Sequence, residues 1–188
     1  MINFHDAQYI ISCPSLEFRP KDKYPEVVFL GRSNVGKSTL INALCSQKVA
    51  FASKSAGKTQ YLNYFLIDKS FYLVDSPGYG FTSYGNRLDE SFSDMMESYF
   101  HNPCLKGAVI LFDARREKLN EDDEMLLRFL KEDKVPFLIV FTKSDVANQS
   151  ELAKAKRLAE SLSSDGIYFS SKGKKLDPVR SAIAKLLG

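Results

Sequence analysis

The chain has 188 residues, of which 44 % are hydrophobic and 26 % charged, a composition that excludes an intrinsically disordered or fibrous protein. Its formal net charge of +3 permits an acidic partner but excludes a strongly basic nucleic-acid-binding tail, and its three separated cysteines match neither a disulfide framework nor a zinc site. Because no signal peptide begins the sequence and its longest apolar run is too short to span a bilayer, we predict a cytoplasmic protein.

Predicted strands and helices alternate along the chain after an irregular N-terminal lead. We expect this lead, residues 1–24, to pack on one domain formed by residues 25–188. Apolar runs predict strands at EVVFL, YLNYFLI, FYLVD, GAVILFD, PFLIVFT and GIYF, the second and third of which form a hairpin. This alternation favours a three-layer α/β architecture with a mostly parallel six-stranded sheet and one antiparallel edge strand.

Apolar residues at helical spacing predict the faces that cover this sheet. Asn120 is expected to cap the third helix and Asp177 the last one, with Pro178 at its first position. The residues expected on the buried faces are Leu40, Ile41, Leu44, Phe92, Met95, Met96, Tyr99, Phe100, Met125, Leu126, Phe129, Leu130, Leu152, Ala155, Ala159, Leu162, Val179, Ile183, Leu186 and Leu187. Because ligands of such sheets bind at the carboxyl ends of the strands, the loops that follow strands should hold the chemistry.

The first of these loops, GRSNVGKS from Gly31 to Ser38, matches the phosphate-loop pattern G-x-x-x-x-G-K-[ST] between a predicted strand and a predicted helix. Glycines let backbone N–H groups converge on phosphate oxygens, and the N-terminus of the following helix favours negative charge. We predict that Lys37 bridges the β- and γ-phosphates of a nucleoside triphosphate and that Ser38 binds Mg²⁺. The alternative is a structural turn with an exposed lysine, which the complete pattern disfavours.

Two further segments are expected to sense the third phosphate. In DSPG, residues 75–78, Asp75 should face the Mg²⁺ ion through water and the Gly78 N–H should reach the γ-phosphate. In SKSAGKTQ, residues 53–60, Thr59 can offer its hydroxyl and carbonyl to both groups in the triphosphate state. Taken alone, the first segment is better explained as a turn and the second as a polar linker; the phosphate loop and the other motifs favour the sensing role.

The TKSD segment, Thr142 to Asp145, is expected to recognise the base. The Asp145 carboxylate can accept both the N1–H and the N2 amine of guanine, whereas adenine presents a bare acceptor that would leave it unpaired. Lys143 would lie along the base, and the Ser171 N–H could donate to guanine O6. GTP is therefore favoured over ATP, although TKSD alone is also explained by a capped helix start.

Tyr79 occupies the position, directly after Gly78, where many signalling GTPases carry a glutamine that orients water. A phenol lacks the paired donor and acceptor of an amide, so we predict slow intrinsic hydrolysis that needs a partner, a cation or another residue for acceleration. Asn34 suggests K⁺ as that cation, a hypothesis that equal rates in KCl and NaCl would exclude. A hydrogen bond that only stabilises the loop is the alternative role of Asn34.

Together the motifs GRSNVGKSTLINAL, GKTQYLNYF, DSPGYGF, FTKSD and YFSSK resemble the EngB/YihA/YsxC family of small bacterial GTPases, from about Pro25 to the C-terminus. The resemblance implies a Ras-like P-loop GTPase fold, hydrolysis of GTP to GDP and phosphate, and a role in assembly of the large ribosomal subunit, with links to cell division and septation. The implied partner is the large ribosomal subunit or its precursor, with its rRNA and ribosomal proteins. A monomer without DNA or a membrane span is expected. Ala56, where the family typically has proline, implies a more flexible first switch.

The resemblance also assigns roles to residues of this chain. It places Lys37, Thr59 and Gly78 in catalysis, and Ser38, Thr59 and Asp75 at the metal. The residues that it implies for nucleotide binding are Gly31, Arg32, Ser33, Asn34, Val35, Gly36, Lys37, Ser38, Thr39, Gly57, Lys58, Thr59, Asp75, Ser76, Pro77, Gly78, Thr142, Lys143, Ser144, Asp145, Phe169, Ser170, Ser171 and Lys172.

The C-terminal region carries more positive charge than the chain as a whole. From Glu151 onward, eight Lys and Arg residues stand against four Asp and Glu residues, a local excess of +4. Such an excess can contact rRNA phosphates, while a solvated helix face is the simpler interpretation. Two other functions stay open: a GTP-dependent switch that acts on a protein partner without RNA, and a P-loop kinase with Arg115 and Arg116 in its lid.

Overall fold

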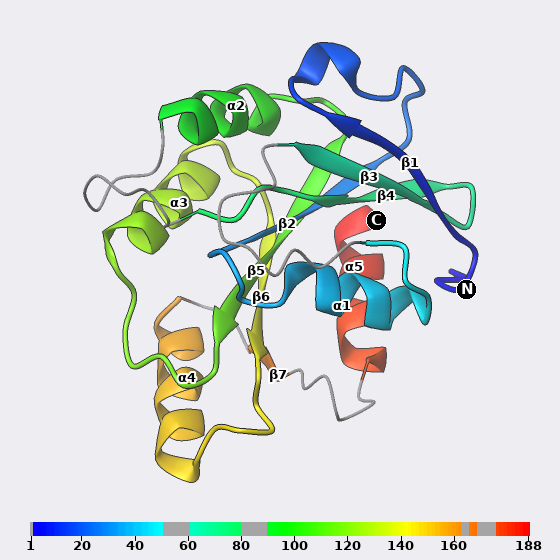
Figure 1. Ribbon diagram of the computed structural model, residues 1–188. Coiled ribbons are helices and arrows are strands. Elements are labelled where there is room, and N and C mark those ends of the chain that lie inside the picture. The colour runs from blue at the N-terminus through cyan, green and yellow to red at the C-terminus, as the bar shows by residue number, and fades with distance from the viewer. Residues whose placement is uncertain (1, 51–60, 80–89, 163–165, 169–175) are drawn as a thin grey trace.

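A seven-stranded β-sheet runs through the centre of the computed structural model, which describes residues 2–50, 61–79, 90–162, 166–168 and 176–188 (Figure 1). The spatial order is β1-β3-β4-β2-β5-β6-β7, and β3 pairs antiparallel with both of its neighbours while the other pairs are parallel. The strands are β1 (Ala7–Cys13), β2 (Glu26–Gly31), β3 (Leu62–Ile67), β4 (Phe71–Asp75), β5 (Leu105–Asp113), β6 (Phe137–Thr142) and β7 (Ile167–Tyr168).

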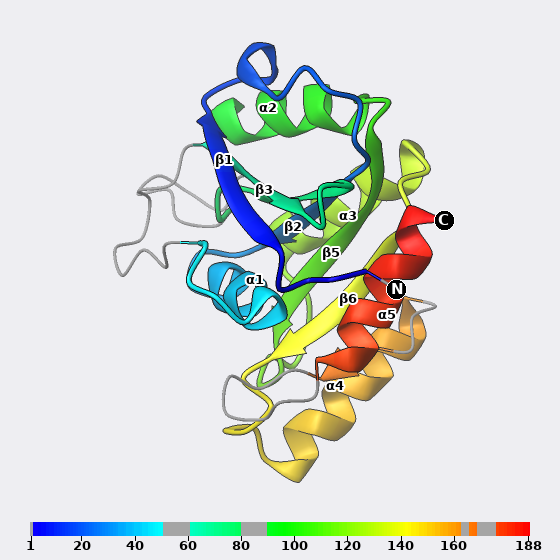
Figure 2. The ribbon, with the colours of Figure 1, turned by 90° about the vertical axis from the view of Figure 1, so that its right-hand side faces the viewer.

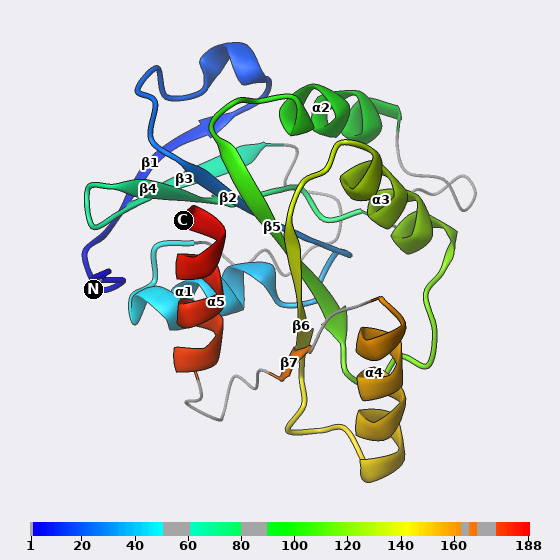
Figure 3. The same cartoon turned by 180° about the vertical axis from the view of Figure 1, so that it is seen from behind.

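Helices cover both faces of the sheet. Figures 1 and 3 show α1 beside α5 on one face, and Figures 2 and 3 show α2, α3 and α4 on the other. The helices are the short 3-10 helix η1 (Leu16–Phe18), α1 (Lys37–Cys45), α2 (Glu90–Phe100), α3 (Glu121–Glu132), α4 (Gln149–Ser161) and α5 (Asp177–Leu187). These layers confirm the predicted Ras-like three-layer α/β class. Within the described ranges, no helix combines the length and apolarity needed to cross a membrane.

Alternation along β2 builds two cores, one on each face of the sheet. Val27 and Phe29 pack with α1 and α5, whereas Val28 and Leu30 pack with α2, α3 and α4. All four side chains are fully buried, which explains why EVVFL is apolar throughout. The phosphate loop follows directly, so it begins at the end of a strand that is fixed from both sides.

The lead is not irregular throughout, because residues 7–13 form the edge strand β1. Its pairing with β3, from Ala7 opposite Ile67 to Cys13 opposite Leu62, satisfies backbone groups that β3 would otherwise leave open. The sheet therefore has seven strands instead of the predicted six, and the antiparallel strand β3 lies one position inside the edge. The sequence of β1 lacks the alternation of a strand, because Tyr9 and Ile10 are both exposed beside an irregularity in the pairing.

Two helix details also differ from the predictions. In α3 the capping box at Asn120 is as expected, but Met125 is 36 % exposed and Leu127 is buried in its place. Positions 126, 127 and 130 also share one helical face, so spacing alone could not choose between the two sets. In α5, Asp177 is the first helical residue instead of the cap, and the capping residue Leu176 forms no side-chain hydrogen bond.

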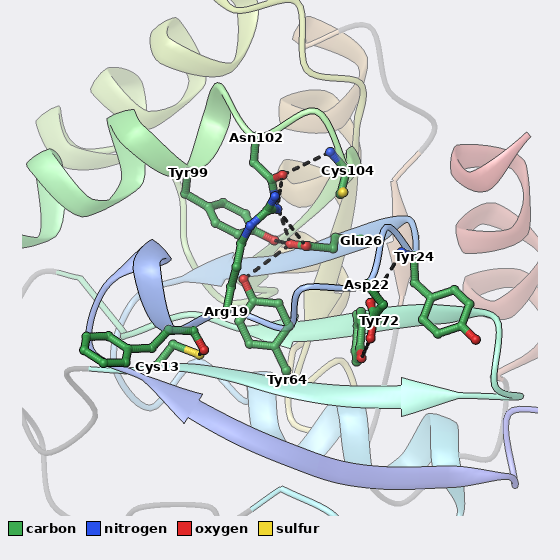
Figure 4. A network of polar contacts seen from close by, with 11 residues as sticks. Cys13, Arg19, Asp22, Tyr24, Glu26, Tyr64, Tyr72, Tyr99, Asn102 and Cys104 are labelled. Atoms are coloured by element: carbon green, nitrogen blue, oxygen red, sulfur yellow. Dashed lines mark hydrogen bonds and ion pairs between the residues drawn. The ribbon is translucent and has the colours of Figure 1, made fainter.

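A buried polar network holds the start of β2, at the end of the strand opposite the phosphate loop (Figure 4). Glu26 is 2 % exposed, and its Oε2 accepts hydrogen bonds from Tyr99 Oη at 2.7 Å and Asn102 Nδ2 at 3.0 Å. Arg19 Nη1 lies 3.4 Å from Oε1, so the network joins the lead, β2 and the end of α2. Burial raises the pKa of Glu26, while the hydrogen bonds and the charge of Arg19 oppose that rise.

The raised pKa of Glu26 predicts a pH-dependent contribution to stability. Because the folded-state pKa lies above the ordinary value of 4.5, this contribution is fully present below pH 4.5 and is lost as the pH rises through the folded-state pKa. Compared with Glu26→Gln, which cannot titrate, the wild-type protein should gain free energy of unfolding as the pH is lowered from neutrality. Urea unfolding at several pH values measures the difference. Glu97→Gln, an exposed change on α2, is the control, and a pH-independent difference for Glu26→Gln would contradict the prediction.

Candidate functional site

The phosphate loop forms the turn from β2 into α1. Gly36 has φ +113° and Asn34 has φ +61°, so the loop uses the left-handed region, which glycine and asparagine tolerate best. The buried Val35 connects the loop to β6, because its carbonyl accepts a hydrogen bond from Thr142 Oγ1 at 2.7 Å. The loop is therefore anchored to the neighbouring strand end as well as to its own helix.

Lys37, the first residue of α1, is buried at the centre of this loop. The residue is only 8 % exposed, and its Nζ donates to the Gly31 carbonyl at 3.2 Å. Burial lowers the pKa of Lys37, and the nearby Asp75 carboxylate opposes that shift. A partly desolvated ammonium enclosed by backbone carries an incompletely compensated charge, which an anionic phosphate would stabilise.

Asp75 lies beside this lysine because β4 pairs in parallel with β2, which places Phe29 opposite Asp75. Ser38 Oγ donates to Asp75 Oδ2 at 2.8 Å, so two of the side chains predicted to bind the metal are in contact. The other oxygen, Oδ1, is buried without a hydrogen-bond partner in the described part of the chain. Burial raises the pKa of Asp75, while Lys37 and Ser38 oppose the rise. An unsatisfied carboxylate oxygen beside a hydroxyl is a donor set that suits Mg²⁺.

Gly78 places the DSPG segment directly against the phosphate loop. A Cβ at this position would lie 2.6 Å from Ser33 Cα and 3.2 Å from Lys37 Nζ, so no larger residue fits without a shift of the backbone. The Ser33 N–H also donates to the Tyr79 carbonyl at 3.0 Å. Ser76 has a structural contact, because its Oγ donates to the Phe29 carbonyl at 2.7 Å and holds the end of β4 on β2.

The Tyr79 side chain points away from the loop into the core. It is 3 % exposed, and its hydroxyl donates to Asp123 Oδ1 in α3 at 2.9 Å. Burial raises the pKa of Tyr79 well above its ordinary value, and Asp123 raises it further. A phenol fixed in this direction does not face the loop where a glutamine would orient water, which agrees with the expectation that Tyr79 does not replace one.

The ends of β5 and β6 form the opposite wall of the site. Lys143 has φ +59°, and its Nζ lies 3.1 Å from Asp113 Oδ2, while Asp145 is exposed. Burial tends to raise the pKa of Asp113, but hydrogen bonds from Arg115 and Lys143 prevail and lower it. A cavity of about 300 Å³ opens here, lined by Arg32, Ser33, Asn34, Val35, Asp113, Arg116 and Lys143.

Sequence reasoning missed Asp113 and Arg116 in this wall. The available signal was that GAVILFD, like FYLVD, ends a buried strand on a carboxylate. Arg115 and Arg116, the pair considered for a kinase lid, are both bound to carboxylates: Arg115 Nη2 lies 2.6 Å from Asp113 Oδ2, and Arg116 Nη1 lies 2.7 Å from Asp123 Oδ2. Both are thus tied to the sheet and α3, which disfavours a lid.

The described structure thus brings together the phosphate loop, residues 75–79 and residues 142–143. Among the described residues, no group of three or more His, Cys, Asp and Glu side chains is placed to hold a metal, so a cation here would need hydroxyl or phosphate ligands as well. The predicted site residues that lie outside the described ranges are Gly57, Lys58, Thr59, Phe169, Ser170, Ser171 and Lys172.

Comparison with known proteins identifies relatives along most of the chain. Residues 26–143 match the family model of the "50S ribosome-binding GTPase". The chain is 42 % identical over 173 residues to a probable GTP-binding protein EngB from Aquifex aeolicus, covering 91 % of this chain and 93 % of that protein. It is 42 % identical over 170 residues to a protein of the same name from Chlorobaculum parvum, covering 89 % of this chain and 88 % of the relative.

Solved structures agree with the fold. A crystal structure of a probable GTP-binding protein engB superimposes with a TM-score of 0.66 at 25 % identity, covering 86 % of this chain and 98 % of that one. Era in complex with MgGDPNP and nucleotides of 16S ribosomal RNA superimposes with a TM-score of 0.65 at 24 % identity, covering 87 % of this chain and 56 % of that one. The second likeness shows the shared fold alone.

The contact between Thr142 and Val35 predicts that one hydroxyl stabilises the phosphate loop. Thr142→Val keeps the shape of the side chain but removes the donor to the Val35 carbonyl, so the free energy of unfolding should fall by about 1–3 kcal/mol. Thr142→Ser keeps the hydroxyl and should lose only about 1 kcal/mol for its missing methyl group. Urea denaturation compares the three proteins. A loss in Thr142→Val no larger than that in Thr142→Ser would contradict the prediction, because the hydroxyl would then contribute no more than the methyl group.

Proposed function

The chain belongs to the EngB family of GTP-binding proteins and is a P-loop GTPase, and from this premise we propose that it is a slowly hydrolysing switch that assists assembly of the large ribosomal subunit. The observation that carries the proposal is the meeting of Lys37, the Ser38–Asp75 pair and Gly78 at one point of the loop. A triphosphate there would touch the phosphate loop and the segment after β4 at once, so that segment would report which nucleotide is bound.

In this proposal the chain's own residues bind and orient the phosphates. Lys37 neutralises charge on the β- and γ-phosphates, and the Gly78 N–H donates to a γ-phosphate oxygen that GDP lacks. Thr59 offers the same phosphate a second contact. The burial of Tyr79 against Asp123 supports the slow rate, since the position that commonly orients water is occupied by a side chain held in the core.

A magnesium ion fits the residues present, and Ser38, Asp75 and Thr59 are the side chains proposed to hold it. The buried, unsatisfied Oδ1 of Asp75 supports this assignment. When bound, the ion would neutralise charge that develops on the phosphate oxygens. Potassium stays a hypothesis, supported by the position of Asn34 on the wall of the cavity beside the loop.

The partner that we propose is the large ribosomal subunit or its precursor, supported by the description of the matching family model. The positive charge of the C-terminal region is weaker support for RNA contact than the count of basic residues suggests, because some of these side chains are bound within the protein. Arg180 Nη2 donates to the Leu44 carbonyl at 2.6 Å, and Lys154 pairs with Glu117, so neither is a free contact for phosphate. A switch that acts on a protein partner without RNA therefore stays the alternative.

Replacement of Asp145 tests the proposed guanine recognition. Asp145→Asn exchanges an acceptor for an amide, so the variant should lose preference for GTP and gain preference for XTP, whose additional carbonyl accepts from the amide. Competition of GTP, XTP and ATP for the purified protein measures the change. Asp133→Asn removes the same charge at the C-terminal end of α3 and should keep wild-type selectivity. Unchanged selectivity in Asp145→Asn would show that another residue reads the base.

Co-sedimentation with large ribosomal subunits tests the proposed partner. At moderate salt, the protein should be enriched with subunits in the presence of a non-hydrolysable GTP analogue and not with GDP, because only the triphosphate reaches Gly78. Lys37→Ala removes the phosphate counter-charge, so it should stay in the supernatant with either nucleotide. Absence of enrichment in both states would contradict the proposal. Enrichment that survives RNase and depends weakly on salt would favour the protein partner.

A further inference from the structure

A series of polar contacts joins the DSPG segment to the start of α3 through Tyr79, Asp123 and Arg116. Tyr79 Oη donates to Asp123 Oδ1 at 2.9 Å, and Arg116 Nη1 donates to Oδ2 at 2.7 Å. Asp123 is fully buried, and its carboxylate also accepts from the Asn120 N–H at 3.0 Å while its own N–H donates back to Asn120 Oδ1. The carboxylate cannot turn away from Tyr79 without breaking the cap of α3.

The backbone of Tyr79 is bound to the phosphate loop. Its carbonyl accepts from the Ser33 N–H at 3.0 Å, and an isolated parallel bridge joins it to Arg32. With its side chain bound to α3 and its backbone bound to the loop, Tyr79 is held on both sides. Gly78, the preceding residue, is thereby fixed in its close contact with Ser33 and Lys37.

We propose that Asp123 is a positioning residue for nucleotide recognition: through the Tyr79 hydroxyl it fixes the Gly78 N–H and so sets the discrimination between GTP and GDP. The inference rests on the proposed contact of Gly78 with the γ-phosphate. If the Tyr79 hydroxyl is lost, Gly78 becomes less ordered, and a triphosphate must order it on binding. GDP makes no contact with Gly78, so the affinity for GDP does not depend on the contacts of Tyr79 with Asp123.

The same core contains a matched control at the opposite end of β2. Tyr99 Oη donates to the buried Glu26 at 2.7 Å, and Arg19 lies 3.4 Å from the same carboxylate. The arginine side chains are similarly exposed, 28 % for Arg19 and 25 % for Arg116. Tyr99→Phe and Tyr79→Phe therefore remove the same hydroxyl from the same kind of buried carboxylate–arginine pair, but only Tyr79 touches the phosphate loop.

The experiment measures the dissociation constants of GDP and of a non-hydrolysable GTP analogue for the wild-type protein, Tyr79→Phe and Tyr99→Phe. Tyr79→Phe should lower the affinity for the analogue relative to GDP by about fivefold. Tyr99→Phe should keep the wild-type ratio within about twofold, even if it lowers the melting temperature as much. Equal ratios in the two variants would overturn the inference, because a purely structural hydroxyl changes stability alone.

A second pair of variants covers the case in which Tyr79→Phe does not fold. Arg116→Gln removes the donor on the other side of Asp123 and should lower the affinity for the analogue relative to GDP, whereas Arg19→Gln should not. Because Arg116 also lines the cavity beside the loop, an equal loss of GDP affinity would assign its effect to direct contact with the nucleotide instead. Lys37→Ala distinguishes a failure of the proposed phosphate site from a failure of the proposed role of Asp123. If it still binds the analogue, the proposed phosphate site is wrong. If it loses the analogue while Arg116→Gln and Arg19→Gln give equal ratios, only the role of Asp123 is wrong.

Discussion

The parallel pairing of β2 with β4 is the constraint on which the site depends. Phe29 lies opposite Asp75, and this register places the carboxylate beside Ser38 and Lys37, which belong to a different segment of the chain. A slip of one residue would turn Asp75 to the other face of the sheet. The register is secured by the two apolar cores and by Ser76, whose hydroxyl binds the Phe29 carbonyl. The packing of the sheet is thus what assembles the polar cluster.

A buried ionisable side chain lies at the start of β2, and another follows its end in the phosphate loop. Burial raises the pKa of Glu26 at the start of the strand and lowers that of Lys37 after its end, so desolvation acts against the charge of each group. Their surroundings differ. Hydrogen bonds from Tyr99 and Asn102 complete the environment of Glu26, whereas Asp75, the neighbour of Lys37, keeps one oxygen without a partner among the described residues. The first environment is complete within the protein, and the second fits a ligand.

Local patterns in the sequence were sufficient to predict the phosphate loop and the position of Asp75. Both depend on residues close in sequence and on the rule that parallel strands end at one edge of the sheet. The strand β1 was missed because its exposed Tyr9 and Ile10 interrupt any alternation, and because its partner among the described strands is β3, some fifty residues later. The contact of Tyr79 with Asp123 was missed for a related reason. Sequence spacing does not predict a hydrogen bond between a residue after β4 and a residue of α3 that lies 44 positions later and meets it only after folding.

The position of β1 at the edge also orders events during synthesis of the chain. Although β1 is synthesised before β3, it has no strand to pair with among the described residues until residues 62–67 have left the ribosome, because its neighbour in the sheet is β3. Once residue 75 has been made, all residues of β1, β2, β3 and β4 have been synthesised, together with Ser38 and Asp75. Because β5 pairs with β2 and β6 pairs with β5, these two strands can join the sheet only after its N-terminal half has been synthesised.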